Sequence, residues 1–402
     1  AGLALAAGAA AQGATYSTLQ RGRYLVNAGD CASCHTAAGG QPFAGGLAVA
    51  TPFGTIYSTN ITPDPTTGIG KWTEQDFQKA MHSGIRRDGK HLYPAFPYPW
   101  FTRVSRADVD AIYAYLKTLA PVHQQNREPE LPWPLSAREV MAGWNTLFFK
   151  EGEFRADPAK SPQWNRGAYL VEGLGHCSAC HTASNLLGAP KKGQNLEGGG
   201  FGEHWYAPSL AGDLRDGIGG WSEADIVEYL KTGANARSAA AGPMADVIRN
   251  STQYLSRGDL RAIAAYLKDL PAAHAGAAAS GNPTIDRQAL ARGEALYLDN
   301  CTGCHMEHGG GQERIFPPLK GSSSVQAKEA DSLIHFVLAG AERPTTGGKP
   351  TGFAMPAFDW KFSDQDVADV VNYIRNAWGN QAAPTSAAQV AKLRGVIAHS
   401  KE

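Results

Sequence analysis

The sequence predicts a mostly α-helical protein built from three tandem copies of one small domain, with long loops inside each copy. One cysteine-containing pentapeptide occurs three times. A serine, an aspartate three residues later and an apolar helical pattern follow each copy of it. Strand signals are weak throughout. The 402 residues, 43% of them hydrophobic, are enough to fill several small cores.

The charge balance argues against a nucleic-acid-binding protein, and the N-terminal stretch argues against a membrane-spanning helix. The chain has 37 basic and 37 acidic residues, a formal net charge of zero, whereas a protein that holds nucleic acid carries a basic surplus. The longest apolar stretch, residues 1–11, is far shorter than the ~20 residues that span a membrane. Its small residues are typical of the end of a secretory signal. We expect residues 1–15 to be a signal remnant or a flexible tail, with an uncleaved anchor as the alternative.

All six cysteines fall within the repeated pentapeptide, which has the form Cys-x-x-Cys-His. Its copies are Cys31-Ala-Ser-Cys34-His35, Cys177-Ser-Ala-Cys180-His181 and Cys301-Thr-Gly-Cys304-His305. This spacing is typical of covalent c-type haem attachment, in which each cysteine forms a thioether with a haem vinyl group and the histidine binds the iron. A single copy is also compatible with a redox Cys-x-x-Cys or half of a zinc site. Three copies that use every cysteine predict three covalently bound haem c groups.

Each motif lies between two helical patterns. An Arg-Gly pair begins an apolar helical segment nine to eleven residues before each motif, and a capped closing helix follows a glycine-rich loop. The pairs are Arg21-Gly22, Arg166-Gly167 and Arg292-Gly293, and the caps are Ser105/Asp108, Ser256/Asp259 and Ser363/Asp366. Each serine and aspartate resemble a capping box in which aspartate replaces the usual glutamate or glutamine. This plan resembles a class I cytochrome c domain. We therefore expect three tandem class I cytochrome c domains with long loops around covalent haem.

These positions divide the chain into domains and linkers. We expect cytochrome c domains at residues 16–122, 163–272 and 285–380, linkers at residues 123–162 and 273–284, and a C-terminal tail at residues 381–402. The first two domains share a Gly-Ile-Gly-x-Trp element, at residues 68–72 and 217–221. They are therefore closer to each other than either is to the third.

Methionine is the common second iron ligand opposite histidine where a haem transfers electrons, and the chain has five methionines. Met306 follows His305 directly and Met141 lies in the first linker, so neither is placed to reach the distal side of a haem. Met244 and Met355 precede the closing helices of the second and third domains, in what we expect to be loops. The expected iron ligands are His35 and Met81, His181 and Met244, and His305 and Met355.

The first domain departs from this pattern. Phe96 occupies the loop position where the third domain has its methionine, and phenylalanine cannot bind iron. Met81, on a helix expected to begin near residue 73, is the remaining thioether and is expected to bind this iron. In the alternative, Met81 only packs in the core, and the iron is five-coordinate or bound by His82 or His91. The other histidines are expected in surface or capping roles, and we expect no catalytic residue.

The first linker has an unusually apolar helix. Ser136 and Glu139 form a capping-box pattern that predicts a helix from Ala137. The segment Trp133–Phe149 is rich in large apolar residues. Three interpretations stay open: it packs between two haem domains, docks on a partner subunit, or lies in the membrane interface.

The combined motifs resemble a known family over residues 16–395. The three Cys-x-x-Cys-His copies, the loop Leu-Tyr-Pro-Ala-Phe-Pro-Tyr at residues 92–98 and Met-Ala-Gly-Trp-Asn at residues 141–145 are similar to the triheme cytochrome c subunits of bacterial membrane-bound dehydrogenases. That family serves alcohol, gluconate, sorbitol, fructose and aldehyde dehydrogenases. The resemblance implies a large partner subunit of molybdenum, quinone or flavin type that oxidises the substrate; a small third subunit is left open. It also implies electron transfer to membrane ubiquinone, peripheral membrane contact and a location at the periplasmic side of the bacterial inner membrane.

The Phe96 loop separates this chain from the alcohol dehydrogenase members, which carry methionine there. A phenylalanine loop with an upstream methionine is more similar to the cytochromes of molybdenum-dependent aldehyde dehydrogenases. Two other functions are considered. One is a catalytic multihaem enzyme, peroxidase-like, that uses an open haem in the first domain with His82 or His91 as its acid–base residue. The other is a soluble electron carrier to an oxidase, against which the apolar linker weighs.

Overall fold

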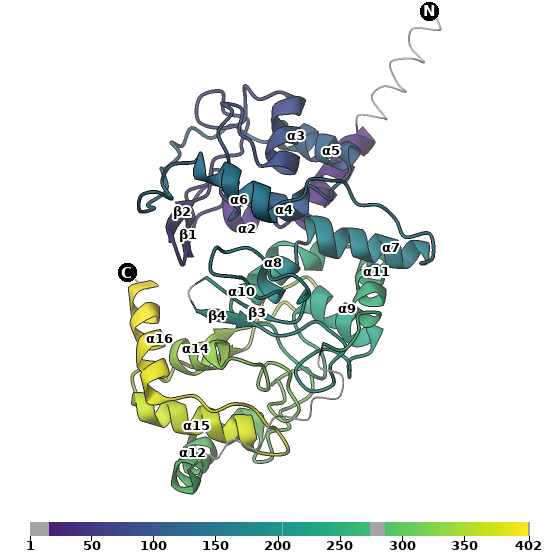
Figure 1. Ribbon diagram of the computed structural model, residues 1–402. Helices are drawn as coiled ribbons and strands as arrows, with labels where there is room; N and C mark the ends of the chain where they lie inside the picture. Colours follow the sequence, from purple (N-terminus) through teal and green to yellow (C-terminus); the bar gives the residue numbers. More distant parts are fainter. Residues whose placement is uncertain (1–15, 203, 274–285, 401–402) are drawn as a thin grey trace, which may run out of the picture. The chain divides into compact units, whose positions relative to one another are not determined.

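The computed structural model describes residues 16–202, 204–273 and 286–400. Within these ranges the chain is mostly helical, and its strands form three short antiparallel hairpins (Figure 1). The hairpins pair β1 (Ala48–Thr51) with β2 (Gly54–Tyr57), β3 (Gly199–Phe201) with β4 (Trp205–Ala207), and β5 (Ala341–Glu342) with β6 (Ala354–Met355). The expectation of a mostly α-helical chain is confirmed.

Contacts along the chain define two compact units. Unit 1 comprises the residues up to His176 together with Asn250–Leu255, and unit 2 comprises Cys177–Arg249 and the residues from Ser256 onward. The first expected domain lies in unit 1 and the third in unit 2, whereas the segments of the second are divided between the units. Residues 1–15 and almost all of the second expected linker, residues 274–284, lie outside the described residues.

The helices follow the order expected around each motif. Unit 1 contains a helix over residues 16–28, α2 (Cys31–His35), α3 (Glu74–Ser83), α4 (Tyr98–Phe101), α5 (Arg106–Leu116), α6 (Val140–Phe148), α7 (Pro162–Tyr169), the π-helix η1 (Leu170–Leu174) and the 3₁₀ turn η2 (Thr252–Tyr254). Unit 2 contains α8 (Ser178–His181), α9 (Glu223–Thr232), α10 (Pro243–Asn250, except its last residue), α11 (Arg257–Lys268), α12 (Arg287–Asn300), α13 (Thr302–His305), α14 (Asp331–Ala339), α15 (Asp364–Asn376) and α16 (Ala387–Ser400). The short helices α2, α8 and α13 hold the three motifs.

A glycine lets the first and closing helices of the third domain cross in direct contact. Gly293 on α12 faces α15. A Cβ there would lie 2.7 Å from the carbonyl carbon of Asp369 and 2.9 Å from Cβ of Tyr373. The preceding Arg292 donates from Nε to the buried Asp369 carboxylate at 2.7 Å. Only a residue without a side chain permits this approach.

The first domain repeats this crossing. A Cβ at Gly22 would lie 2.8 Å from the carbonyl carbon of Ala111 and 2.8 Å from Cβ of Tyr115 on α5. Arg21 donates from Nε to the buried Asp108 carboxylate at 2.6 Å. The Arg-Gly pairs of these two domains therefore have a structural role: the glycine admits the neighbouring helix and the arginine pairs with a buried aspartate.

The serine caps of the closing helices form as expected. The hydroxyls of Ser105, Ser256 and Ser363 accept from the N–H of the third residue that follows, at 3.3, 3.1 and 3.2 Å. The reciprocal bond forms at Ser363, whose N–H donates to Asp366 at 2.9 Å. At Asp108 the expected reciprocal role is wrong, because Arg21 and the Tyr169 hydroxyl hold that carboxylate instead.

The segment expected as a C-terminal tail, residues 381–402, contains a core helix. α16 packs against α14 and α15 (Figure 1), and Val390, Leu393 and Ile397 are buried in the core of the third domain. Their spacing of three and four residues is that of one helical face. The expectation of a tail is therefore wrong for Ala387–Ser400.

The guanidinium of Arg375 on α15 is fully buried in the same domain without a salt bridge among the described residues. It donates to three backbone carbonyls, those of Val325, Ala327 and Ala383, at 2.9, 3.0 and 3.0 Å. Because carbonyls of two chain segments, residues 325–327 and residue 383, converge on one side chain, Arg375 ties these segments to α15.

The apolar linker helix begins later than expected. α6 starts at Val140, and no side chain caps it, so the predicted capping box of Ser136 and Glu139 is wrong. Arg138 donates to the carbonyl oxygen of His91 at 3.1 Å, which holds the preceding residues in turns against the first domain. In the described part of the chain, no helix is both long and apolar enough to cross a membrane.

Candidate functional site

The three motif histidines are oriented in the same way by backbone carbonyls. The Nδ1 atoms of His35, His181 and His305 lie 2.6, 2.7 and 3.0 Å from the carbonyl oxygens of Thr59, Pro208 and Pro317. Because a carbonyl only accepts, each Nδ1 carries the proton and each Nε2 keeps its lone pair. Burial lowers the pKa of all three imidazoles, and the bond to the carbonyl opposes this. A neutral ring with its Nε2 lone pair available is the form that binds a metal.

A glycine with positive φ closes each histidine loop. Gly45, Gly198 and Gly311 have φ of 76°, 92° and 61°, and their N–H groups donate to the carbonyls of the motif histidines at 2.8, 2.9 and 3.0 Å. A Cβ at Gly45 would contact the backbone of Thr59, and one at Gly311 would contact that of Pro317. These backbones carry the carbonyls that hold the histidines. Sequence reasoning missed the three glycines because they stand 10, 17 and 6 residues after their histidines, with no common spacing.

The six cysteines are free thiols of different exposure: Cys34 and Cys304 are exposed, and the other four are half-buried. None of the six forms a disulfide. Partial burial raises the pKa of the Cys31 thiol to about 12, and those of Cys177 and Cys301 to about 11. Within the described ranges, no group of three or more His, Cys, Asp or Glu is placed to hold a metal ion.

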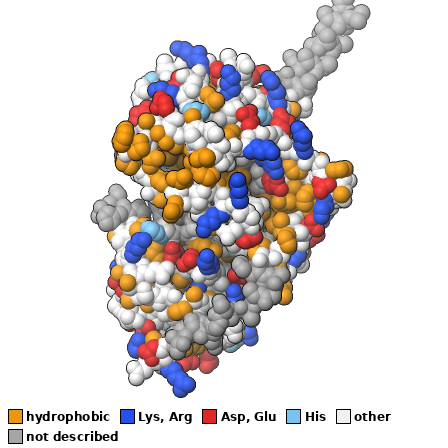
Figure 2. Space-filling model, viewed as in Figure 1, with side chains coloured by type: hydrophobic (Ala, Val, Ile, Leu, Met, Phe, Trp, Pro, Cys, Tyr) orange, Lys and Arg blue, Asp and Glu red, His pale blue; other side chains and the backbone are white. Residues whose placement is uncertain are grey.

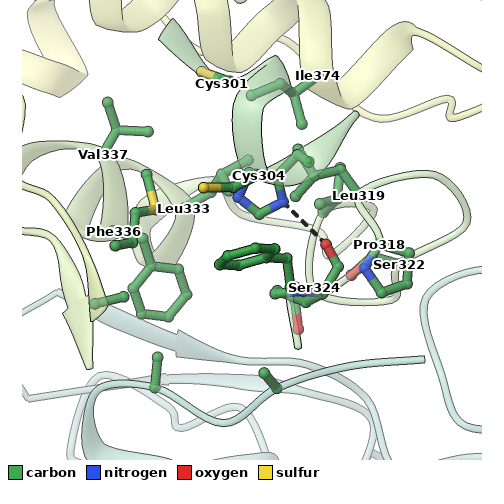
Figure 3. Close-up of a pocket in the computed structure, with 18 of the residues that line it drawn as sticks. Cys301, Cys304, Pro318, Leu319, Ser322, Ser324, Leu333, Phe336, Val337 and Ile374 are labelled. Atoms are coloured by element: carbon green, nitrogen blue, oxygen red, sulfur yellow. Dashed lines mark hydrogen bonds between the residues drawn. The ribbon is translucent and has the colours of Figure 1, made fainter. Parts of the chain in front are cut away.

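In the third domain the motif faces an apolar pocket of about 220 Å³ (Figure 3). Cys301, Cys304 and His305 line this pocket, and Figure 3 shows Phe336 of α14 on another wall. Met355, in strand β6 rather than in the expected loop, lines it as well. The histidine and the methionine expected to bind one iron thus share one cavity with both cysteines of the motif.

Met244 lies in the first turn of α10 and is half-buried, so the expected loop is a helix at this position. Nearby, Trp205 of β4 stacks on His335 of α14 with ring centroids 4.2 Å apart. A Cβ at Gly242 would lie 2.7 Å from the Trp205 ring, and residues 238–241 line the third-domain pocket. The segment that leads to Met244 therefore contacts the third domain. The expectation of a surface or capping role is wrong for His335, which is buried.

Met81 is buried on α3, with 5% of its surface exposed. The helices α3 and α14 both end at a glycine with positive φ, Gly84 at 64° and Gly340 at 77°. Met81 and Val337 each stand three residues before that glycine. In this register Met81 corresponds to Val337, which lines the third-domain pocket.

The structure also places Phe96 and the two alternative histidines of the first domain. The Phe96 ring packs edge-on against the Phe101 ring, with ring centroids 5.4 Å apart. His82 Nε2 and His91 Nδ1 are buried without a hydrogen-bond partner among the described residues. By the same helix-end register, His82 corresponds to Leu338, which lies in the third-domain core and does not line the pocket. The second iron ligand of the first domain stays a prediction, with Met81 favoured.

The chain is similar to known proteins over nearly its whole length. The family model described as cytochrome c matches residues 19–120 and 290–378, which contain the first and third motifs. The chain is 45% identical to the gluconate 2-dehydrogenase cytochrome c subunit of Pantoea cypripedii, over 94% of this chain and 89% of that protein. It is 44% identical to the cytochrome c subunit of the quinone alcohol dehydrogenase of Gluconobacter oxydans, over 98% and 85%. It is also 38% identical to the fructose dehydrogenase cytochrome subunit of Gluconobacter japonicus, over 94% and 82%.

Proposed function

Because the chain belongs to the family of cytochrome c subunits of bacterial dehydrogenases, we propose that it carries electrons from a partner dehydrogenase subunit through three haems to membrane ubiquinone. Covalent haem c is the cofactor of the cytochrome c family. When bound, haem iron alternates between its ferric and ferrous states and so accepts and passes on one electron at a time.

The threefold recurrence of one arrangement carries the proposal. Each Cys-x-x-Cys-His motif has its histidine Nδ1 held by a backbone carbonyl and its loop closed by a glycine with positive φ. The residues present fit the group: two free thiols for thioethers and one oriented Nε2 for iron at each motif. The attachment pairs are Cys31/Cys34, Cys177/Cys180 and Cys301/Cys304.

For the opposite iron position we propose Met81, Met244 and Met355. The common pocket of His305 and Met355 supports the third pair. The register of α3 with α14 supports Met81, whose flexible thioether would have to replace the loop methionine that Phe96 excludes. A ligand from a helix instead of a loop leads us to expect that the first haem differs in potential from the other two.

We propose docking through the segment Trp133–Phe149. Trp133 is 85% exposed and Leu147 of α6 is 66% exposed. Met141 and Trp144 of the same helix are buried within unit 1. Figure 2 shows hydrophobic side chains gathered on the face of unit 1 where α6 lies. Exposed apolar side chains of this size are typical of an interaction surface.

The partner we propose is a large dehydrogenase subunit of molybdenum, quinone or flavin type, at the periplasmic side of the inner membrane. The names of the relatives, cytochrome subunits of gluconate and quinone alcohol dehydrogenases, support a dehydrogenase partner. The Phe96 loop favours the molybdenum type, and a small third subunit stays open.

The intact mass of the purified protein tests the haem proposal. We expect the polypeptide plus three haem masses, and the loss of one haem from the Cys177→Ala/Cys180→Ala variant. Polypeptide produced without haem maturation provides the reference mass. Any other number of covalent haems in the unmodified protein would refute the proposal.

Replacing Trp133 and Leu147 by serine tests the docking segment. Each large apolar side chain contributes about 1.5–3 kcal/mol when buried, so the double substitution should weaken retention on native membranes by roughly 10²- to 10⁴-fold. Trp360, which is 80% exposed in the third domain, provides a matched control in Trp360→Ser. Equal retention of both variants would contradict a docking role for this segment.

A further inference from the structure

The walls of the apolar pocket in the third domain include one permanently cationic side chain, that of Arg343. Among the described residues that line it, Arg343 is the sole lysine or arginine, and none is an aspartate or glutamate. Arg343 follows β5, directly after the strand that pairs with Met355 in β6. It is 6% exposed. A buried cation beside an apolar cavity costs free energy unless an anion compensates it.

Of the three guanidinium nitrogens of Arg343, only Nη1 donates hydrogen bonds within the described residues. Nη1 donates to the carbonyl oxygens of Arg314 and Ile315 at 2.9 and 3.3 Å. Nε is buried and has no hydrogen-bond partner, and no bond from Nη2 is found within the described ranges. The N–H groups of Nε and Nη2 form the side of the guanidinium that binds both oxygens of a carboxylate. The unused donors are thus the pair that a carboxylate fits.

The protein itself supplies no carboxylate for this edge. Within the described residues, Arg343 forms no ion pair with an aspartate or glutamate. The nearby Glu228 pairs with Arg314 at 2.8 Å and lies 3.9 Å from Lys349. Burial lowers the pKa of the Arg343 guanidinium, with no carboxylate to oppose the effect. The Phe353 ring, 5.3 Å away, offers only a weak cation–π contact.

We propose that the Nε and Nη2 groups of Arg343 bind a propionate carboxylate of the haem attached to Cys301 and Cys304. This inference rests on the proposed function, because that haem supplies the anion. Haem c carries two propionates, and a propionate in an apolar pocket needs a cation as much as Arg343 needs an anion. The pair sets the charge beside the third iron: with Arg343 in place the propionate is neutralised, and the ferrous state, which carries less positive charge, is favoured over the ferric state.

Redox titration of the holoprotein with Arg343→Gln, Arg343→Lys and Lys349→Gln variants tests the pair. In the Gln variant the uncompensated propionate stabilises ferric iron. The reduction equilibrium of one of the three haems should then shift about tenfold toward ferric iron. This corresponds to a fall of about 59 mV in its reduction potential, for a one-electron couple. The Lys variant keeps the positive charge, so the reduction potential of this haem should stay close to that of the unmodified protein. Lys349→Gln removes a neighbouring cation that does not line the pocket, and should leave all three potentials in place.

The outcomes separate this inference from the proposed function. An intact mass without haem on Cys301 and Cys304 in the unmodified protein would contradict the proposed function. Three attached haems whose potentials do not respond to Arg343→Gln would overturn only the propionate pair. An equal fall in the Gln and Lys variants would also overturn it, because packing and not charge would then set the potential. If the third haem is lost from the Gln variant but kept in the Lys variant, the pair is supported; loss from both would contradict it.

Discussion

Replacing Gly293 by alanine should destabilise the third domain, although alanine is the better helix former. The new Cβ would lie 2.7 Å from the carbonyl carbon of Asp369 and 2.9 Å from Cβ of Tyr373. Neither atom belongs to a flexible side-chain end, so α12 has to move away from α15 by roughly 1 Å to restore ordinary carbon contacts. Such overpacking typically costs about 1–3 kcal/mol, and the helix preference of alanine returns up to about 1 kcal/mol.

The expected net loss is therefore about 1–2 kcal/mol. For a domain of this size, that corresponds to a fall of roughly 5–15 °C in the melting temperature. Differential scanning calorimetry of the holoprotein measures it as a shift of the transition that belongs to the third domain. Gly395 is the matched control, because it lies on the exposed side of α16 and a Cβ there would meet nothing within 4 Å. Gly395→Ala should raise the same transition by a few degrees, from helix preference alone.

The opposite signs of the two substitutions make the test decisive. If Gly293→Ala stabilised the domain as Gly395→Ala does, the close crossing of α12 and α15 would be refuted. Hydrogen exchange gives a second readout, since the amides of α12 should lose protection in Gly293→Ala and keep it in the control.

Three further substitutions test the candidate sites and their support. Met81→Leu keeps the volume of the side chain but removes the thioether, so one haem of three should become high-spin in its absorption spectrum, whereas Met306→Leu should leave all three unchanged; an unchanged spectrum of Met81→Leu would make Met81 a packing residue. Gly311→Ala places a Cβ at a φ of 61° against the backbone of Pro317, at a cost of about 1–2 kcal/mol, and should perturb the third haem spectrum; a spectrum like that of the unmodified protein would contradict its role in holding the histidine loop. Arg375→Met leaves three buried carbonyls without their donor and should cost about 3 kcal/mol or more in a denaturant titration; a loss below about 1 kcal/mol would show that these loops do not depend on it.

Local patterns were enough to find most of the helices and their caps. The serine caps of the closing helices follow from hydrogen bonds between residues three apart, so they were predictable from neighbouring residues alone. The predicted capping box at Ser136 does not form, since α6 starts only at Val140; Arg138 between them donates to the carbonyl of His91, almost fifty residues earlier in the chain. The reciprocal cap at Asp108 failed because that carboxylate pairs with Arg21.

By itself, the sequence determined the three motifs, their histidines and the mostly helical class, because each depends on residues within a few positions of one another. Tertiary structure alone decided which carbonyl fixes each histidine, since Thr59, Pro208 and Pro317 lie 24, 27 and 12 residues downstream with no common pattern. It also decided that Met355 and Arg343 share the pocket of Cys301 and Cys304. A pocket brings together residues from segments that the chain order separates, and its charge balance becomes visible only when all its walls are in place.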